Sequence, residues 1–141
     1  MPGLFDDLAM PADLRARFHP ISPASGRRIA SADDPDDVCW LDLLGWNSQA
    51  AQDYRYGRDE RLRKLGRDFT SEEAFRDFGD FLATLTADWH LVAPTGRVLG
   101  VECNYDTARQ LWNGTEFRWL RQQAMDFLNA EGNFIPASWR R

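Results

Sequence analysis

The side chains in this chain that could perform covalent chemistry are few. They are two histidines, His19 and His90, and two cysteines, Cys39 and Cys103. Cys103 follows Glu102, so together with His90 these residues could supply a thiol nucleophile, a base and an orienting acid. A catalytic cysteine needs a lowered pKa, however, and a neighbouring carboxylate raises it. We therefore interpret Cys103 as a half-buried thiol after a strand, and a small cysteine-dependent enzyme is the weakest alternative.

The sequence contains no motif for a metal ion or a phosphate group. Neither histidine has a second histidine, a cysteine or a glutamate at the spacing of zinc ligands. Segment 32–37 holds four aspartates, but it lacks the alternating ligands, central glycine and final glutamate of a calcium-binding loop. No glycine lies between a strand and a helix with a lysine after it. We expect no catalytic residue, no metal site and no cofactor.

Composition indicates one domain with a real core and excludes two classes of partner. Of the 141 residues, 43% are apolar and 13% aromatic, which is too many for a disordered chain. The net charge is −5, whereas a general nucleic-acid binder needs a basic face. No apolar run reaches the roughly 18 residues of a membrane span, and no signal peptide is apparent. We expect neither nucleic acid nor membrane as a partner, and a reducing cytoplasm as the compartment.

Helical periodicity is clearest after Thr70. Apolar side chains recur three and four residues apart at Phe75, Phe78, Leu82, Leu85 and Trp89. Glu73 lies three residues after Thr70, which is the spacing of a capping box. The pattern predicts a helix from residue 70 to residue 89 with one apolar face.

The front half of the chain is less regular. The apolar run 38–44, bounded by turn residues, predicts a strand. Ser48 is a natural cap for a helix over 49–65, which Gly66 would end. We also expect one or two helical turns over 12–18 and a weak strand over 27–31.

The back half contains a hairpin and two helices. Pro94-Thr95-Gly96 is turn chemistry between two β-prone runs, 91–93 and 98–101. Asn104 or Asp106 could cap a short helix, and Thr115 could cap a final helix that Gly132 ends. The expected fold is α+β and predominantly α-helical, with a small β-hairpin or sheet packed against about four helices.

Two groups of side chains could contact a partner. The segment 55–67 holds six arginines and lysines, which indicates a solvated helix face or, more rarely, a surface for an acidic partner. Aromatic and arginine side chains together are typical of protein interfaces. On this basis we predict a set of contact residues, Arg118, Trp119, Arg121, Phe134 and Trp139. For Trp119 the alternative is that it covers the short preceding helix.

From Trp89 onwards the sequence resembles the tail assembly chaperones of long-tailed bacteriophages and prophages. In that family a tryptophan at a helix end leads into a hairpin with a glycine turn, then a capped helix, then a final helix ending near Asn-Phe. The matching features here are Trp89, Gly96, the run 104–111, and Asn133-Phe134. With the upstream strand and the helix after Ser48, the resemblance covers about residues 36–134.

The resemblance implies a small protein of the host bacterial cytoplasm that binds the tape measure protein, recruits tail tube subunits and is absent from the finished virion. We expect an apolar, aromatic surface to bind a partner helix, and weak self-association. The corresponding domain limits are an N-terminal arm (1–35), the chaperone-like domain (36–134) and a C-terminal tail (135–141). The alternative is a virion-associated structural adaptor, such as a head–tail completion or minor tail protein.

Overall fold

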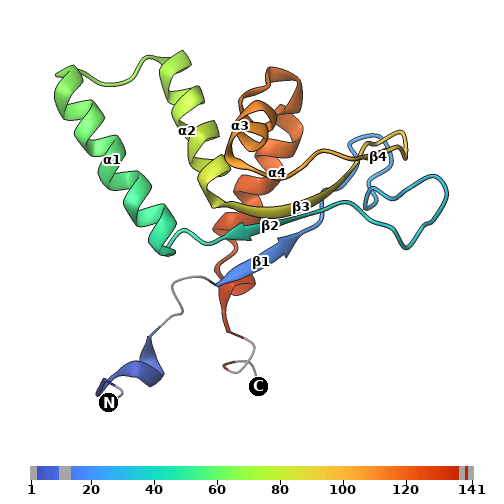
Figure 1. Cartoon of the computed structure of the whole chain (residues 1–141), viewed down its shortest axis with the longest axis horizontal. Coiled ribbons are helices and arrows are strands. Elements are labelled where there is room, and N and C mark those ends of the chain that lie inside the picture. Colours follow the sequence, from blue (N-terminus) through green and yellow to red (C-terminus); the bar gives the residue numbers. More distant parts are fainter. Residues whose placement is uncertain (1–2, 10–13, 137–138, 140–141) are drawn as a thin grey trace.

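The computed structural model describes residues 3–9, 14–136 and 139, and its centre is a four-stranded antiparallel sheet (Figure 1). The strands follow the chain order across the sheet: β1 (Arg15–Phe18), β2 (Trp40–Leu44), β3 (Thr86–Val92) and β4 (Val98–Leu99). The helices are α1 (Gln49–Leu65), α2 (Ser71–Leu85), α3 (Tyr105–Asn113) and α4 (Arg118–Asn129). About 48% of the chain is helical and 17% is strand, which confirms the predicted α+β class.

The helices α2, α3 and α4 lie on one side of the sheet, and α1 stands beside α2 at the outside of the domain (Figure 1). Inward side chains of the sheet and of these helices form the main core, which includes Phe18, Leu41, Leu82, Trp112 and Leu128. Along β1 exposed and buried positions alternate, as expected for a strand with one face on a core. The sheet and the helical layer therefore share one apolar interior.

Local capping signals place the starts of three helices as predicted. The Ser48 hydroxyl accepts the Ala51 N–H at 3.2 Å at the start of α1. Thr70 and Glu73 form the predicted capping box before α2. Asn104, the first of the two predicted candidates, caps α3 in the same reciprocal way with Thr107. The end of α1 at Gly66, which has a left-handed φ of 69°, is confirmed as well.

Pairing across the sheet overrides the helical prediction at two places. The helical turns expected over 12–18 are wrong where the structure describes them, because Arg15–Phe18 pairs with β2 as an edge strand. The helix expected to reach Trp89 ends at Leu85, and Trp89 lies opposite Leu41 within β3. In both cases pairing with a neighbouring strand satisfies the backbone N–H and C=O groups. Because side chains alternate between the two faces of a strand, Phe18 and Trp89 are buried.

Of the remaining predicted elements, some are confirmed and others are wrong. The strand expected over 38–44 is confirmed over Trp40–Leu44, with Val38 in an isolated bridge, and the hairpin turn is confirmed with Gly96 at φ 90°. The expected strand over 27–31 is reduced to two isolated bridges, from Arg28 and from Ala30. The Thr115 cap is wrong: residues 115–117 form a short 3₁₀ turn, and α4 starts without a side-chain cap.

The predicted N-terminal arm and the end of the last helix also differ from expectation. The arm is expected over residues 1–35, but parts of this range belong to the domain. β1 pairs within the sheet, and Ile29 is in a second small core cluster. Residues 3–9 project away from the sheet and helices (Figure 1). Helix α4 ends at Asn129, before Gly132, and a 3₁₀ turn, η3 (Glu131–Phe134), follows it.

We predict opposite effects for alanine at two helical glycines. A Cβ at Gly79 in α2 would lie 2.8 Å from the side-chain carbon Cγ of Asn113 and 3.1 Å from an Arg121 nitrogen. Gly79→Ala should therefore destabilise the protein by about 1–3 kcal/mol, despite the better helix propensity of alanine. Gly57→Ala in α1, where a Cβ meets nothing within 4 Å, should stabilise it by about 0.5–1 kcal/mol. Urea unfolding of both variants checks this, and a stabilised Gly79→Ala protein would contradict it.

Candidate functional site

The predicted contact residue Arg121 lies inside the helical layer. Its side chain donates to the Phe75 carbonyl of α2 at 2.7 Å and to the Trp112 carbonyl of α3 at 3.1 Å. The guanidinium carbon lies 3.8 Å from the centre of the Phe75 ring and 4.8 Å from that of Phe78. Only 8% of the residue is exposed. Arg121 thus joins three helices and offers little surface to a partner.

Burial lowers the pKa of Arg121 from its ordinary value, and the neighbouring Arg118 charge lowers it further. Among the described residues no carboxylate pairs with Arg121, so backbone carbonyls and aromatic rings surround this cation instead. The Trp112 carbonyl is in the last turn of α3, where the helix dipole favours a positive charge. The guanidinium therefore acts as a C-terminal cap for α3.

The other two predicted contacts on α4 differ from each other. Arg118 is exposed and lies over the Phe75 ring at 5.1 Å. Trp119 is half-buried and packs against both core clusters, the main one and the small one formed by Ile29, Cys39 and Val92. Trp119 therefore links the helical layer to the far end of the sheet, and Arg118 is the α4 contact residue that remains accessible.

Phe134 and Trp139 lie beyond the other end of α4. The Phe134 ring packs edge-to-face on Phe127 at 5.7 Å and covers Gly45. Trp139 is 45% exposed, and its backbone N–H donates to the Pro136 carbonyl at 2.9 Å. Arg118 begins α4, whereas Phe134 packs near its C-terminal end on Phe127; α4 is twelve residues long, about 18 Å, so these two predicted contacts lie apart.

We define the C-terminal apolar patch as Phe134, Ile135 and Trp139. Ile135 is exposed and follows η3, and η3 lies beside the start of β1 (Figure 1). Of the predicted contact residues, this patch contains the two aromatic ones after α4. Its two exposed members, Ile135 and Trp139, present apolar surface to solvent.

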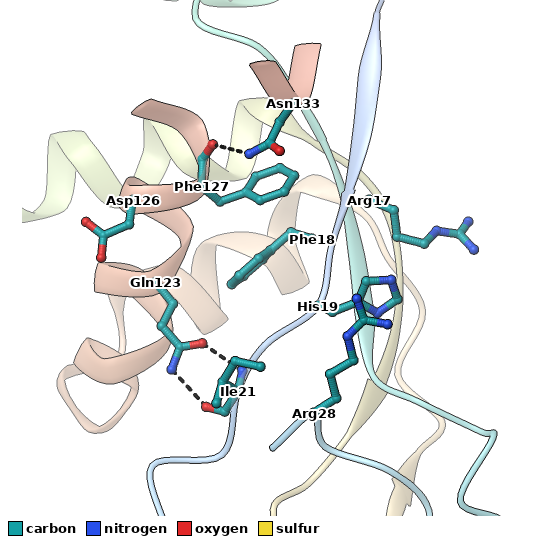
Figure 2. A pocket seen from close by; sticks show the side chains of 9 residues that line it. All are labelled: Arg17, Phe18, His19, Ile21, Arg28, Gln123, Asp126, Phe127 and Asn133. Carbon is teal, nitrogen blue, oxygen red and sulfur yellow. Dashed lines mark hydrogen bonds between the residues drawn. The ribbon is translucent and has the colours of Figure 1, made fainter. Parts of the chain in front are cut away.

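A second feature, which the sequence did not indicate, is a groove between β1 and α4. We call it the β1–α4 groove. Figure 2 shows Phe18 pointing from β1 towards Phe127 of α4, and these two rings, 5.3 Å apart, form an apolar floor. The groove has a volume of about 660 Å³. Its lining comprises Arg17, Phe18, His19, Ile21, Arg28, Gln123, Asp126, Phe127 and Asn133.

One side chain closes the lower end of the groove in Figure 2. The Gln123 amide accepts the Ile21 N–H and donates to the Ile21 carbonyl, each at 2.8 Å. The two bonds tie the loop after β1 to α4 across 102 positions of sequence. Gln123 thus pairs with the loop as a neighbouring strand would, and the width of the groove is fixed there.

The groove carries its positive charge on the β1 side and a negative charge on α4. Arg17 is neutralised, because it pairs with Asp42 at 2.9 Å and stacks on Trp40 at 3.7 Å. Arg28 has no ion pair among the described residues. Asp126 is the acid of the opposite wall, on α4. An apolar segment with an acidic residue towards the β1 side would fit this arrangement.

His19 adds an unsatisfied polar atom to the same wall. Its Nδ1 is buried and has no hydrogen-bond partner. Burial lowers the pKa of His19 below its ordinary value, and the Arg28 charge contributes in the same direction. The shift disfavours the protonated imidazole, and the buried Nδ1 is out of reach of a group in the groove.

The structure separates the residues of the cysteine-enzyme alternative. His90 pairs with Asp37, with Nε2 2.7 Å from Oδ1, and no hydrogen bond joins Cys103 to His90 or Glu102 in the described part of the chain. Burial raises the pKa of the Cys103 thiol to about 11, with a contribution from Asp88. The thiol is thus held in its less nucleophilic, protonated form.

The basic segment of α1 is mostly paired within the chain. Arg58 and Arg61 both approach Asp77 of α2, at 3.8 and 2.9 Å, and Arg63 and Arg67 pair with Glu60 and Glu73. Arg55 and Lys64 have no ion pair among the described residues. This arrangement favours a solvated helix face that also anchors α1 to α2.

No group of three or more histidine, cysteine, aspartate or glutamate side chains among the described residues could hold a metal ion. No described helix has both the length and the apolar character to cross a membrane.

Comparison of the chain with protein-family models, with curated proteins and with solved structures found no match.

We predict that Arg121 and Arg118 differ strongly in their effect on stability. Arg121→Met keeps much of the side-chain volume but leaves the buried Trp112 carbonyl without its donor, so it should cost about 2–4 kcal/mol. Arg118→Met, at the exposed neighbour on the same ring, should change stability by less than about 0.5 kcal/mol. Thermal and urea unfolding measure both, and equal effects would show that Arg121 does not join the helices.

We also predict slow alkylation of Cys103. With a pKa of about 11, the Cys103 thiol should react with iodoacetamide at pH 8 at least tenfold more slowly than a free thiol. The Cys39→Ala variant isolates Cys103 for this measurement by mass spectrometry. A Cys103 rate equal to or above that of free cysteine would show an activated thiol and would favour the enzyme alternative.

Proposed function

We propose that this chain is a tail assembly chaperone of a long-tailed bacteriophage or prophage. In this role it binds the tape measure protein in the host bacterial cytoplasm, recruits tail tube subunits during tail assembly, and leaves before the virion is complete. The proposal rests first on the resemblance over residues 36–134. The hairpin glycine, the Asn104-capped helix and the final Asn-Phe of that resemblance are Gly96 in the β3–β4 turn, the start of α3, and η3.

The observation that supports a binding role most directly is the C-terminal apolar patch. Ile135 and Trp139 are 38% and 45% exposed after the last long helix, and Phe134 before them is half-buried against the main core. Such side chains gain free energy when a partner covers them, by about 25 cal/mol per Å² of apolar area. A tape measure protein is a long helical chain with an apolar stripe, which could lie against these side chains.

The state of Cys103 supports binding over catalysis. The raised pKa of this thiol and the pairing of His90 with Asp37 leave the most reactive side chains of the sequence without the arrangement that covalent catalysis uses. The accessible chemistry of the described surface is then apolar contact, aromatic contact and charge.

The test uses the purified full chain and a fragment of the tape measure protein from the same phage. Isothermal titration calorimetry should show binding, and Trp139→Ala should weaken it by at least about tenfold, as expected for an aromatic interface anchor. Tyr56→Ala is the matched control, since Tyr56 is an exposed aromatic residue on α1. Absence of wild-type binding, or equal loss in both variants, would contradict the proposal.

Analysis of purified particles separates the chaperone from the virion-associated adaptor. A chaperone should be absent from tails in which the tube protein is abundant. If mass spectrometry finds the chain in stoichiometric amounts in those particles, the adaptor interpretation replaces the proposed one.

A further inference from the structure

The first described segment is Gly3–Ala9, and from here on the N-terminal arm means this segment. Its large apolar side chains are exposed to solvent. Leu4, Phe5 and Leu8 are 90%, 70% and 76% exposed, the highest values among the large apolar residues described apart from Tyr56. The backbone bonds of the arm, and the bond from the Gly3 N–H to Asp6, join residues within the arm. In Figure 1 the arm projects away from the sheet and helices. The described residues of the domain therefore leave these apolar side chains uncovered.

The arm is also acidic. Asp6 and Asp7 lie between Phe5 and Leu8, and Asp6 already accepts the Gly3 N–H. Asp7 therefore remains available to a basic partner group. The arm presents one carboxylate flanked by large apolar side chains.

The β1–α4 groove has the complementary chemistry. Its floor is the apolar pair Phe18 and Phe127, continued by Ile21 at the lower end (Figure 2). Arg28 on the β1 side has no ion pair among the described residues. The groove is shallow and open to solvent, and its volume of about 660 Å³ has room for a few side chains.

We infer that the β1–α4 groove receives the N-terminal arm of a second copy of this chain. Apolar side chains of the arm cover Ile21 and Phe127, and the Asp7 carboxylate pairs with Arg28. In Figure 2 the Asp126 side chain points away from Phe18 and Phe127, so it does not oppose an acidic group on the β1 side.

The occupant is a second copy because of the direction of the chain. The arm precedes the start of β1, whereas Ile21 and Arg28 follow its end, and in Figure 1 the arm projects away from the sheet and helices. The contact joins two different surfaces, an arm and a groove, so one chain can offer its arm while its own groove takes another. This inference concerns self-association and does not depend on the proposed function.

Sedimentation velocity of the full chain over a range of concentrations tests the inference, with no other protein present. The wild type should associate as concentration rises. The arm variant Phe5→Asp/Leu8→Asp and the groove variant Ile21→Asp/Arg28→Glu should each have a dissociation constant at least about tenfold higher. Tyr56→Asp, at an exposed site outside both surfaces, should associate like the wild type.

A mixture of the two defective variants distinguishes arm exchange from other contacts. The arm variant keeps an intact groove and the groove variant keeps an intact arm, so an equimolar mixture should form heterodimers although each variant alone is monomeric. Charge exchange supplies a second readout: Asp7→Arg should restore association with a chain that carries Arg28→Glu alone. Circular dichroism of each variant establishes that it is folded.

A wild type that stays monomeric at all concentrations overturns the inference, since the groove then has no second copy in it. So does association that survives in the arm variant, or a folded mixture that remains monomeric. None of these results bears on binding to a tape measure fragment, because that fragment is absent from the experiment.

Discussion

The arrangement of the helical layer depends on the guanidinium of Arg121. It is a cation in a mostly apolar environment, and an unpaired buried charge is ordinarily very costly. Here the cost is reduced by two backbone carbonyls, by the negative end of the α3 dipole and by the faces of Phe75 and Phe78. These contacts come from α2 and α3, so α4 can hold its position only if both helices hold theirs.

Gly79 makes this arrangement possible, because its missing side chain lets α3 approach α2 closely enough for Asn113 and Arg121 to fill the space. The consequence extends to the far side of α4. Phe127 and Gln123 belong to the same helix as Arg121 and form one wall of the β1–α4 groove. The shape of a surface feature is thereby coupled to a contact buried on the other side of the helix.

The sequence predicts the elements whose signals are local. Ser48, Thr70 and Asn104 each accept a bond from an N–H three residues later, so a short window contains the whole interaction. Prediction from the sequence fails where pairing with a distant strand determines the secondary structure. Arg15–Phe18 is too short to show a clear period, and it is a strand because β2 pairs with it. Trp89 fits a helical stripe in sequence, but pairing with Leu41 places it in the sheet.

The candidate sites show the same division. Arg118 and Arg121 have similar sequence neighbours, yet one is exposed and the other buried, because the Phe75 carbonyl that accepts from Arg121 lies 46 positions away. The groove depends on the bond between Ile21 and Gln123, which are 102 positions apart, and no local pattern encodes it. Exposed apolar side chains near the two termini, in contrast, follow from short segments that add little to the core. Covering them can therefore contribute binding free energy without remodelling the sheet or the helices, which is the property that a protein acting by docking requires.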